Sequence, residues 1–344
     1  MRLIFASGDP GGARAIAPVA ALAVKQGHNV YIIRHGAIVS DHLGQTVPWL
    51  WLDPGSPEAL LDQYQPDALL FTTSVNDGMA LDLAFAAWAR GVPTAHILDN
   101  WTNYGARMLD SDGRRLSPNL YMVMDDMAKK MALAEGISPL ALRVTGTPAL
   151  AHLTQHSPAA LGNLIFVSEP VSNDQGRTPA GLGFRGYTED QVLALVLAAL
   201  KKSKNGVPLQ VLLHPREDQM LLAQVLKKNS GTLDVNILTG NKRYEAMSNA
   251  RAVIGMSSIL LYESWLVGLP CLSVQPDLLI QSLRYLQGRP GLSFIDTQSP
   301  LELAILELLA GPTLEHLAQA RVERARHQNA ASKVLKVLTD YVRA

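Results

Sequence analysis

The sequence predicts an α/β protein with two doubly wound domains, and three observations support this fold class. Short apolar stretches alternate with helical patterns along the 344-residue chain, as in parallel sheets that are covered by helices. The alternation stops over residues 146–162 and then restarts. The length is too great for one average domain and suits two. We therefore expect an N-terminal domain over residues 1–155 and a C-terminal domain over residues 156–312.

The first half of the chain contains six stretches that predict strands. Each is an apolar run, which is typical of strands that are buried on both faces of a parallel sheet. The expected strands cover residues 3–6, 29–34, 67–73, 93–98, 119–124 and 141–144. Helical spacing over residues 13–26 and 77–89 places helices after the first and third of these strands.

The second half repeats this alternation and ends in a helical tail. The expected strands cover residues 163–167, 209–213, 235–238, 252–255 and 270–274, and the expected helices cover 188–202, 217–228 and 259–267. Residues 313–344 contain no Gly or Pro, and their apolar positions roughly hold one face of a helix. We expect this tail to be a long C-terminal helix whose length lets it pack back on the N-terminal domain.

Composition and charge exclude several classes of protein. Hydrophobic residues make up 48% of the chain and charged residues 17%, which excludes disorder and supports sizeable cores. Thirty Lys and Arg balance thirty Asp and Glu, so no net field attracts nucleic acid or anionic lipid. No stretch reaches the roughly 18 uncharged apolar residues that span a bilayer. We expect a cytoplasmic protein with no nucleic-acid partner and at most peripheral membrane contact.

Cysteine and histidine usage argues against disulfide and metal chemistry. Cys271 is the only cysteine, which excludes an internal disulfide and fits a reducing compartment. It lies inside a predicted apolar strand, where we expect a small buried hydrophobe. His152 and His156 are four residues apart, but without a helical pattern or a neighbouring acid they make a weak metal site. We expect neither a metal ion nor a cofactor.

Two pairs of polar residues follow predicted strands in the second half. His214 and Pro215 end one apolar run and precede Arg216, while Ser257 and Ser258 end another run and open a helix. The carboxyl ends of parallel strands form the crevice where such sheets bind ligands. An imidazole, together with hydroxyls at a helix N-terminus, suits a phosphate group. Helix capping is the alternative role for these serines and for the histidine.

The organisation and these two motifs resemble known enzymes. Two nucleotide-binding-like domains with one linker and a long C-terminal helix resemble the GT-B glycosyltransferases and their epimerase relatives. In those enzymes two Rossmann-like domains face each other across a cleft. The pairs 214–215 and 257–258 are similar to the His-Pro and Ser-Ser motifs of bacterial enzymes that use CMP- or CDP-activated donors, such as sialyl-, polysialyl- and Kdo-type transferases. Residues 166–172 are similar to the segment that opens the donor domain of the sialyltransferases.

The resemblance implies a donor site in the second domain. It places the nucleotide near Glu169 and Pro170 and the donor phosphate at the two motifs, where His214 would stabilise the departing phosphate. Many GT-B enzymes carry a ribose-binding Glu on the helix that here contains Glu263. Ser257 and Glu263 are about one and two-thirds turns apart, so both are expected to face the cleft. A surface helix charge is the alternative for Glu263.

The Gly-rich turn after the first strand is expected on the acceptor side of the cleft. It contains Asp9, Gly11 and Gly12 and leads to Arg14, but its glycines match neither the dinucleotide fingerprint nor a P-loop. The resemblance implies that this turn lines the acceptor site, with Asp9 as a possible base and Arg14 as a contact for an anionic group. The alternative is a tight turn that requires small residues.

A second acidic candidate follows the strand at residues 93–98. Asp99 matches the acid of a sialyltransferase motif whose carboxylate activates the acceptor hydroxyl, and we rank it ahead of Asp9 as the base. Asn100 and Trp101 replace the rest of that motif. Trp101 is expected either to stack on a sugar or to anchor a loop. Residues 72–78 form another polar strand end that is expected to border the same cleft.

The leading hypothesis is therefore a metal-independent, inverting GT-B glycosyltransferase. It would move a sugar from a nucleotide-activated donor, with a CMP-sugar favoured, to a glycan or lipid-linked hydroxyl acceptor in surface-polysaccharide synthesis. The first alternative is a non-hydrolysing UDP-N-acetylglucosamine 2-epimerase, since residues 214–217 faintly match its His-Arg-Arg-Glu stretch. Its Asp-Ser-Gly-Gly turn is, however, replaced by Gly-Met-Ser-Ser at residues 255–258. The second alternative is a catalytically silent nucleotide-sugar-binding protein.

Overall fold

The computed structural model describes residues 1–40, 48–73, 78–159, 162–181, 183–238, 243–297 and 300–344. The chain forms two compact units. Unit 1 comprises Met1–His152 together with Arg324–Ala344, and unit 2 comprises Leu153–Glu323. The first crossing between the units thus lies three residues before the position expected from the sequence. The second crossing lies inside a helix of the tail.

Unit 1 contains a parallel seven-stranded sheet in the order β3-β2-β1-β4-β5-β6-β7. The strands are β1 (Arg2–Ala6), β2 (Asn29–Ile33), β3 (Leu50–Leu52), β4 (Ala68–Phe71), β5 (Thr94–Ile97), β6 (Leu120–Val123) and β7 (Leu142–Val144). Six of them lie inside an expected apolar run or extend it by one residue. The edge strand β3 was not expected, because three residues carry too little pattern to separate a strand from a loop.

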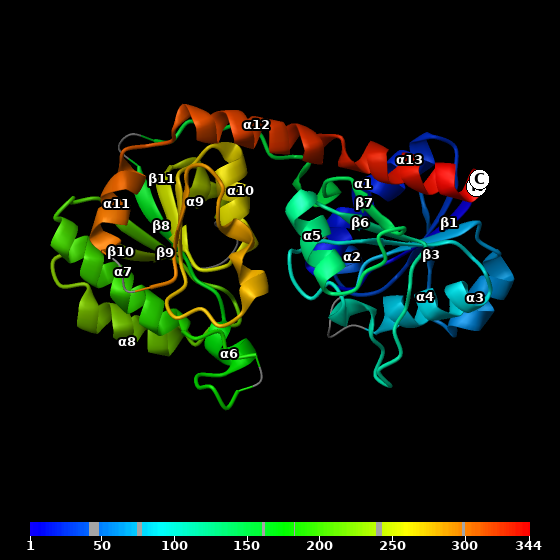
Figure 1. The fold of residues 1–344 in the computed structure, drawn as a ribbon, viewed down its shortest axis with the longest axis horizontal. Helices are drawn as coiled ribbons and strands as arrows, with labels where there is room; N and C mark the ends of the chain where they lie inside the picture. The colour runs from blue at the N-terminus through cyan, green and yellow to red at the C-terminus, as the bar shows by residue number, and fades with distance from the viewer. Residues whose placement is uncertain (41–47, 74–77, 160–161, 182, 239–242, 298–299) are drawn as a thin grey trace. The chain divides into compact units, whose positions relative to one another are not determined.

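Helices cover both faces of this sheet (Figure 1). They are α1 (Pro10–Lys25), α2 (Ala37–Ser40), α3 (Pro57–Tyr64), α4 (Met79–Ala89), α5 (Asp126–Ala134) and the C-terminal α13 (Ala330–Arg343). α1 begins where Asp9 caps it and Pro10 opens its first turn, a position where proline loses no helical hydrogen bond. The helix expected over 77–89 is present from Met79, and residues 74–77 lie outside the described residues.

Unit 2 contains a parallel six-stranded sheet in the order β10-β9-β8-β11-β12-β13. Its strands are β8 (Asn163–Val167), β9 (Leu209–Leu212), β10 (Val235–Leu238), β11 (Ala250–Gly255), β12 (Cys271–Val274) and β13 (Leu292–Ile295). The five predicted strands are all present. The sequence did not predict β13, since three of its four residues are partly exposed and they form no continuous buried run.

Helices also lie on both faces of the unit 2 sheet (Figure 1). They are α6 (Val171–Gln175), α7 (Glu189–Ser203), α8 (Gln219–Asn229), α9 (Arg243–Ser248), α10 (Ile259–Val267), α11 (Leu301–Leu309) and most of α12 (Leu314–Gln328). α8 begins two residues later than expected, because Asp218 caps it by accepting the amides of Met220 and Leu221 at 3.0 Å. Cys271 is completely buried in this unit, as the sequence predicted.

The tail is two helices rather than one long helix, which corrects the sequence prediction. Asn329 separates α12 from α13, and its side-chain amide donates to the Ala325 carbonyl at 2.9 Å. Asparagine side chains compete for backbone groups in this way, so the residue weakens helix continuity without being a Gly or Pro. α13 buries Val334, Leu335 and Leu338 in the core of unit 1.

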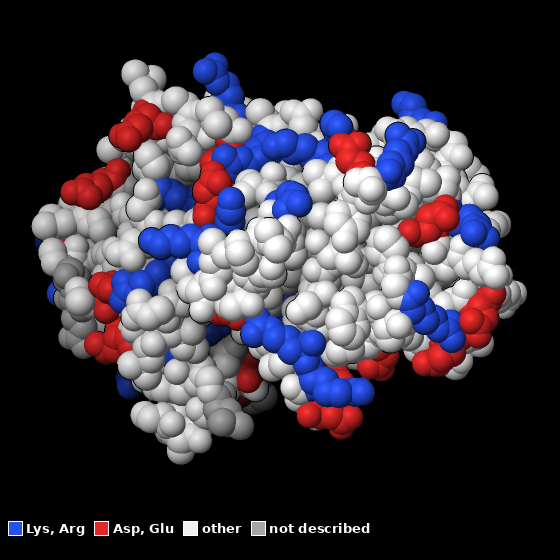
Figure 2. Space-filling view, turned by 45° about the vertical axis from the view of Figure 1, so that its right-hand side comes forward, with Lys and Arg blue, Asp and Glu red and all other residues white. Residues whose placement is uncertain are grey.

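Charge is distributed in small mixed groups on the surface. Figure 2 shows Lys and Arg side chains interspersed with Asp and Glu on the face in view. This distribution agrees with the equal numbers of the two charge types in the sequence. None of the helices in the described ranges is both long enough and apolar enough to cross a membrane.

Candidate functional site

The strand order of each sheet marks one position where ligands are expected. The order in which successive strands are added to the sheet reverses between β1 and β4 in unit 1 and between β8 and β11 in unit 2, so the loops that follow these neighbouring strands lead to opposite sides of the sheet. In open α/β sheets ligands bind at such switch points, outside the carboxyl ends of the strands. The polar residues that the sequence singled out follow these four strands, together with β5 and β9.

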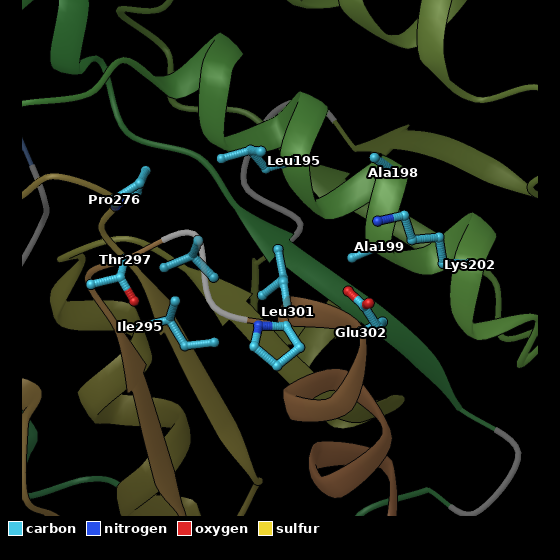
Figure 3. A pocket seen from close by; sticks show the side chains of 11 residues that line it. Leu195, Ala198, Ala199, Lys202, Pro276, Ile295, Thr297, Leu301 and Glu302 are labelled. Atoms are coloured by element: carbon cyan, nitrogen blue, oxygen red, sulfur yellow. The ribbon is translucent and has the colours of Figure 1, made fainter.

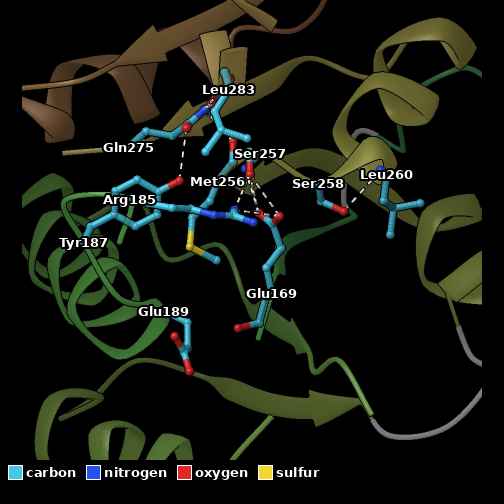
Figure 4. A network of polar contacts seen from close by, with 12 residues as sticks. Glu169, Arg185, Tyr187, Glu189, Met256, Ser257, Ser258, Leu260, Gln275 and Leu283 are labelled. Carbon is cyan, nitrogen blue, oxygen red and sulfur yellow. Dashed lines mark hydrogen bonds and ion pairs between the residues drawn. The ribbon is translucent and has the colours of Figure 1, made fainter. Parts of the chain in front are cut away.

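In unit 2 the switch point holds Glu169, Ser257 and Arg185 in one network (Figure 4). The Ser257 amide donates to Glu169 Oε2 at 2.6 Å, and the Ser257 hydroxyl donates to Oε1 at 3.0 Å. Arg185 Nη1 donates to the Ser257 hydroxyl oxygen at 2.6 Å and lies 3.4 Å from Glu169 Oε1. Both charged side chains are largely buried, at 13% and 14% exposed. The serine predicted to bind phosphate therefore already contacts a carboxylate.

Arg185 was not predicted from the sequence, although the backbone fixes its position. Its carbonyl accepts the Leu279 amide at 2.9 Å. The next residue, Gly186, has φ +105°, and a Cβ there would lie 2.0 Å from the Asp277 carbonyl oxygen. Only glycine fits this close approach. Burial is the largest single influence on the pKa of Arg185 and lowers it, but the charges and hydrogen bonds of Glu169 and Tyr187 together outweigh burial and raise the pKa, so the guanidinium is charged.

Tyrosine side chains support this network from behind. The Tyr285 hydroxyl donates to the Ser257 carbonyl at 2.7 Å, and the Tyr187 hydroxyl donates to Gln275 Oε1 at 3.0 Å. Both tyrosines are buried, and burial raises their pKa values, so both keep their protons at neutral pH. Gln275 Nε2 in turn donates to the Met256 carbonyl at 3.2 Å, so the loop that carries Ser257 is held by Tyr285 directly and by Tyr187 through Gln275.

His214 and Glu217 form a second polar turn after β9. The His214 amide and the Ser168 hydroxyl both donate to the Glu217 carboxylate. Burial raises the pKa of Glu217 to about 7. His214 Nδ1 accepts the Arg216 amide at 3.2 Å, which leaves Nε2 as the N–H of the neutral ring. An N–H on Nε2 is what the predicted donation from His214 to a phosphate would require, and that role stays a prediction.

The His214 ring is neutral in this environment. Burial lowers its pKa from the usual value, and the Arg216 charge acts in the same direction. Arg216 itself forms an ion pair with Asp174 at 2.5 Å. Arg216 and Pro215 are both exposed. The predicted phosphate contact through Arg216 would therefore require it to exchange Asp174 for the ligand.

Ser258 and Glu263 occupy places different from those expected. The Ser258 hydroxyl accepts the Leu260 amide at 3.2 Å and caps α10, which is the alternative role given by the sequence. Glu263 lines a hollow of about 150 Å³ with His156 and other side chains, and Ser257 is not part of that lining. Glu263 thus lies toward α9 and residues 153–156, and the expectation that it shares a surface with Ser257 stays a prediction.

A larger hollow of about 440 Å³ lies between α7 and α11, near the ends of β12 and β13 (Figure 3). Leu195, Ile295 and Leu301 are among its lining residues, as are Lys202 from α7 and Glu302 from α11. None of the residues predicted for the donor site lines it. Its size alone therefore does not make it the candidate site.

In unit 1 the Gly-rich turn packs tightly against acidic and hydroxyl groups. Asp9 accepts the Gly12 amide at 3.3 Å and caps α1. A Cβ on Gly11 would lie 2.3 Å from Asp99 Oδ2, and a Cβ on Gly12 would lie 2.1 Å from the Thr72 hydroxyl. The turn thus requires small residues, as its alternative interpretation stated. Arg14 lies half-buried near the start of α1.

Asp99 forms a buried ion pair that the sequence did not reveal. Arg107 Nη1 lies 2.6 Å from Asp99 Oδ1, and each side chain is 7% exposed. The same nitrogen donates to the Thr73 carbonyl at 2.7 Å, and Arg107 Nε donates to the Thr102 carbonyl at 3.2 Å. Arg107 belongs to a short 3-10 turn, Ala106–Met108, in a stretch with no periodic pattern that could indicate it.

Asp9 differs from Asp99 because, among the contacts of the described residues, none joins Asp9 to Arg107 within hydrogen-bond distance. Burial and, to a smaller extent, the charge of Asp99 raise the pKa of Asp9, Arg107 lowers it, and the net result is a pKa of about 6. A carboxylate with a pKa near 6 is charged at neutral pH and binds a proton more readily than an ordinary Asp. The ranking of Asp99 ahead of Asp9 as the base stays a prediction, and this electrostatic setting is an argument for Asp9.

A neutral histidine lies beside the ion pair. His96 is completely buried, its Nε2 lies 3.4 Å from the Thr73 hydroxyl, and its ring lies 4.7 Å from that of Tyr121. Burial holds its pKa well below the usual value, and the charge of Arg107 adds to this effect. His96 therefore supports Thr73 and Arg107 without adding charge.

Trp101 is a structural residue, which corrects one of its two expected roles. Its side chain is completely buried and its indole Nε1 donates to Asp125 Oδ2 at 3.0 Å. A ring with no exposed face cannot stack on a sugar, so it anchors the loop. Asn100 is partly exposed, and its side-chain oxygen accepts the Trp101 amide at 2.7 Å.

The described residues contain no group of three or more His, Cys, Asp or Glu side chains that could hold a metal ion. His152 and His156 accordingly form no such cluster within the parts of the chain that the structure covers. The donors at the two switch points are instead amides, hydroxyls and guanidinium groups. These groups bind oxyanions through charge-assisted hydrogen bonds.

Comparison with solved structures identifies the fold. A UDP-GlcNAc 2-epimerase from Neisseria meningitidis, solved with UDP-GlcNAc bound, matches with a TM-score of 0.68 and 14% identity, over 99% of this chain and 100% of that chain. The chain has the GT-B fold. MurG from Acinetobacter baumannii matches with a TM-score of 0.59 and 14% identity, over 98% and 99% of the two chains.

Other GT-B structures extend this comparison. A glycosyltransferase from Rickettsia africae matches with a TM-score of 0.65 and 12% identity, over 99% of this chain and 97% of that chain. Further similar structures are named UDP-N-acetylglucosamine 2-epimerases. No protein-family model matches the chain, and no curated protein sequence matches it. At these identities the likeness establishes the fold alone.

Proposed function

We propose that the chain is a nucleotide-sugar enzyme in which unit 2 binds the nucleotide and unit 1 supplies the group that takes a proton. The observation that carries this proposal is the arrangement at the β8/β11 switch point. Three hydrogen-bond donors from Arg185 and Ser257 converge there beside the neutral imidazole of His214. Such donors suit a phosphate whose negative charge increases when the bond to the sugar breaks.

The reaction that best fits this arrangement is 2-epimerisation of a UDP-sugar. Several structures with this fold are named UDP-GlcNAc 2-epimerases, and one of them was solved with UDP-GlcNAc. When a base removes the proton from C2, the electron pair forms a C1–C2 double bond and the nucleoside diphosphate leaves C1. Return of a proton to the opposite face of C2, with re-addition of the diphosphate at C1, completes the inversion. Asp9, whose pKa is about 6, is charged at neutral pH and suits removal of the C2 proton. A UDP-sugar therefore replaces the CMP-sugar as the preferred substrate.

Glycosyl transfer is the second candidate, and two observations favour it. The pairs 214–215 and 257–258 resemble the motifs of CMP-sugar transferases, and the fold is shared with MurG and a glycosyltransferase from Rickettsia africae. The same base would then take the proton of an acceptor hydroxyl. An acceptor-dependent reaction distinguishes this candidate from an epimerase, which needs only its nucleotide sugar.

Proton NMR of the purified protein with UDP-GlcNAc tests the proposal. Epimerase activity would give new anomeric signals from the C2 epimer without any acceptor. A parallel incubation with CMP- and UDP-sugars and a panel of hydroxyl acceptors would reveal transfer as release of free nucleotide. Failure of the protein to bind any nucleotide or nucleotide sugar in calorimetry would overturn the proposal, while binding without turnover would indicate a catalytically silent protein.

A further inference from the structure

The Glu169 carboxylate occupies a set of donors that would also fit an oxyanion. Its two oxygens accept from the Ser257 amide at 2.6 Å and from the Ser257 hydroxyl at 3.0 Å, and Arg185 Nη1 lies 3.4 Å away. Amide, hydroxyl and guanidinium donors around one anionic group are the usual chemistry of phosphate recognition. In this structure a side chain of the protein takes the place of that anion.

We propose that Arg185 and Ser257 form a phosphoryl-binding subsite and that Glu169 is an internal carboxylate that a phosphoryl group displaces. The ligand class is a pyrophosphate-bearing molecule, and a nucleoside diphosphate if the proposed function holds. Glu169 is then a competitor of the ligand, whereas the sequence alone had given it a direct contact with the nucleotide. The two roles predict opposite effects of removing its charge.

Arg185 retains a donor that Glu169 does not use. Among the described residues, Arg185 Nε is buried and has no hydrogen-bond partner. An unpaired buried donor of this kind costs free energy, and a ligand that satisfies it recovers that cost. A carboxylate has two oxygens, whereas a terminal phosphoryl group has three and can contact Nε as well as Nη1. The subsite is therefore incompletely satisfied by its internal occupant.

The backbone of the donors is held by contacts outside the subsite, whereas the carboxylate is held by the donors themselves. The Leu279 amide holds the Arg185 carbonyl and the Tyr285 hydroxyl holds the Ser257 carbonyl. Glu169 follows β8 in a turn, and within the described part of the chain its side-chain hydrogen bonds are those with Ser257 and Arg185 that it would exchange. Rotation of this one side chain would open the subsite without moving its donors, which remain preorganised for the ligand.

Calorimetric titration with inorganic pyrophosphate and, separately, with UDP tests this inference on the full chain. Glu169→Gln keeps the size of the side chain but removes its charge, and it should tighten pyrophosphate binding several-fold. Arg185→Gln should weaken it by about tenfold or more, the usual loss for one charge-assisted hydrogen bond. Arg177→Gln is the matched control, because Arg177 lies on the same loop and pairs with Asp190 at the surface.

The outcomes separate this inference from the proposed function. Pyrophosphate binding that Arg185→Gln weakens and Glu169→Gln strengthens supports the subsite, even if UDP does not bind. UDP binding that neither variant alters overturns the subsite and leaves the nucleotide function intact. Weaker binding in Glu169→Gln also overturns it, since Glu169 would then be a ligand contact. The direction in which Glu169→Gln changes the affinity does not depend on whether Arg185→Gln folds well. Thermal unfolding of each variant reports its folding separately.

Discussion

The two switch points have the same topology but differ in their balance of charge. In unit 2 one carboxylate, Glu169, faces one guanidinium, Arg185, so the charges balance. In unit 1 two carboxylates, Asp9 and Asp99, share one guanidinium, Arg107, which pairs closely with Asp99 alone. The comparison indicates a division of roles, in which the balanced cluster can exchange its anion for a ligand and the cluster with excess negative charge can bind a proton.

The largest expected effect is on turnover, from Asp9→Asn. Loss of a general base typically costs 10²–10⁴-fold in rate, and we expect that loss in kcat. Asn is also a good N-cap, so α1 should keep its stability. Because the pKa of Asp9 is raised to about 6, activity of the wild type should fall as the pH drops through 6, where the base becomes protonated. An unchanged kcat in Asp9→Asn, measured by NMR, would remove Asp9 from the mechanism.

Arg107→Met is expected to produce the next largest effect, on stability. It leaves Asp99 buried without its cation, and breaking a buried pair in this way costs about 3–5 kcal/mol. The double variant Arg107→Met with Asp99→Leu removes both charges and should recover much of the loss. Urea unfolding of the two single variants and the double variant measures the coupling. Additive losses would show that the pair is not energetically linked.

The substitution Gly11→Ala should lower the free energy of unfolding by about 1–3 kcal/mol. The new Cβ would lie 2.3 Å from Asp99 Oδ2, so the ion pair of Asp99 with Arg107 would have to shift. Gly55→Ala is the matched control, since a Cβ there meets no atom within 4 Å. Thermal unfolding of both variants measures the difference. Equal changes would mean that the turn does not pack against Asp99 as described.

A further expected effect is a pH dependence of stability from Glu217. Burial raises its pKa to about 7 in the folded state from 4.5, so the folded protein holds this proton more tightly than the unfolded chain. Its contribution to stability is therefore fully present below pH 4.5 and is lost as the pH rises through 7. Glu217→Gln cannot titrate, so its stability relative to the wild type should improve between pH 5 and 8. A difference that is constant over this range would contradict the assignment.

The sequence predicted the elements that carry a continuous apolar run, and it predicted less where the chain is irregular. The strands on both sides of each switch point were expected, as were Asp9, Glu169 and Ser257 at their ends. The edge strands β3 and β13 were missed because they are short or half-exposed. Arg107 and Arg185 were missed because each lies in a loop whose path depends on distant contacts.

Side-chain roles were harder to predict than positions. The sequence placed Trp101 and Asp99 near one strand end, but it could not show that Trp101 is buried against Asp125 or that Asp99 pairs with Arg107. Polar partners that are eight or more residues away leave no periodic signal. The electrostatic argument for Asp9 as the base therefore depended on the structure.

Titration of UDP into the wild type, Arg185→Gln and Asp9→Asn by calorimetry tests the division of roles between the two clusters most directly. The account predicts that UDP binds the wild type and Asp9→Asn with similar affinity and binds Arg185→Gln at least about tenfold more weakly. UDP binding that is lost in Asp9→Asn and kept in Arg185→Gln would contradict it.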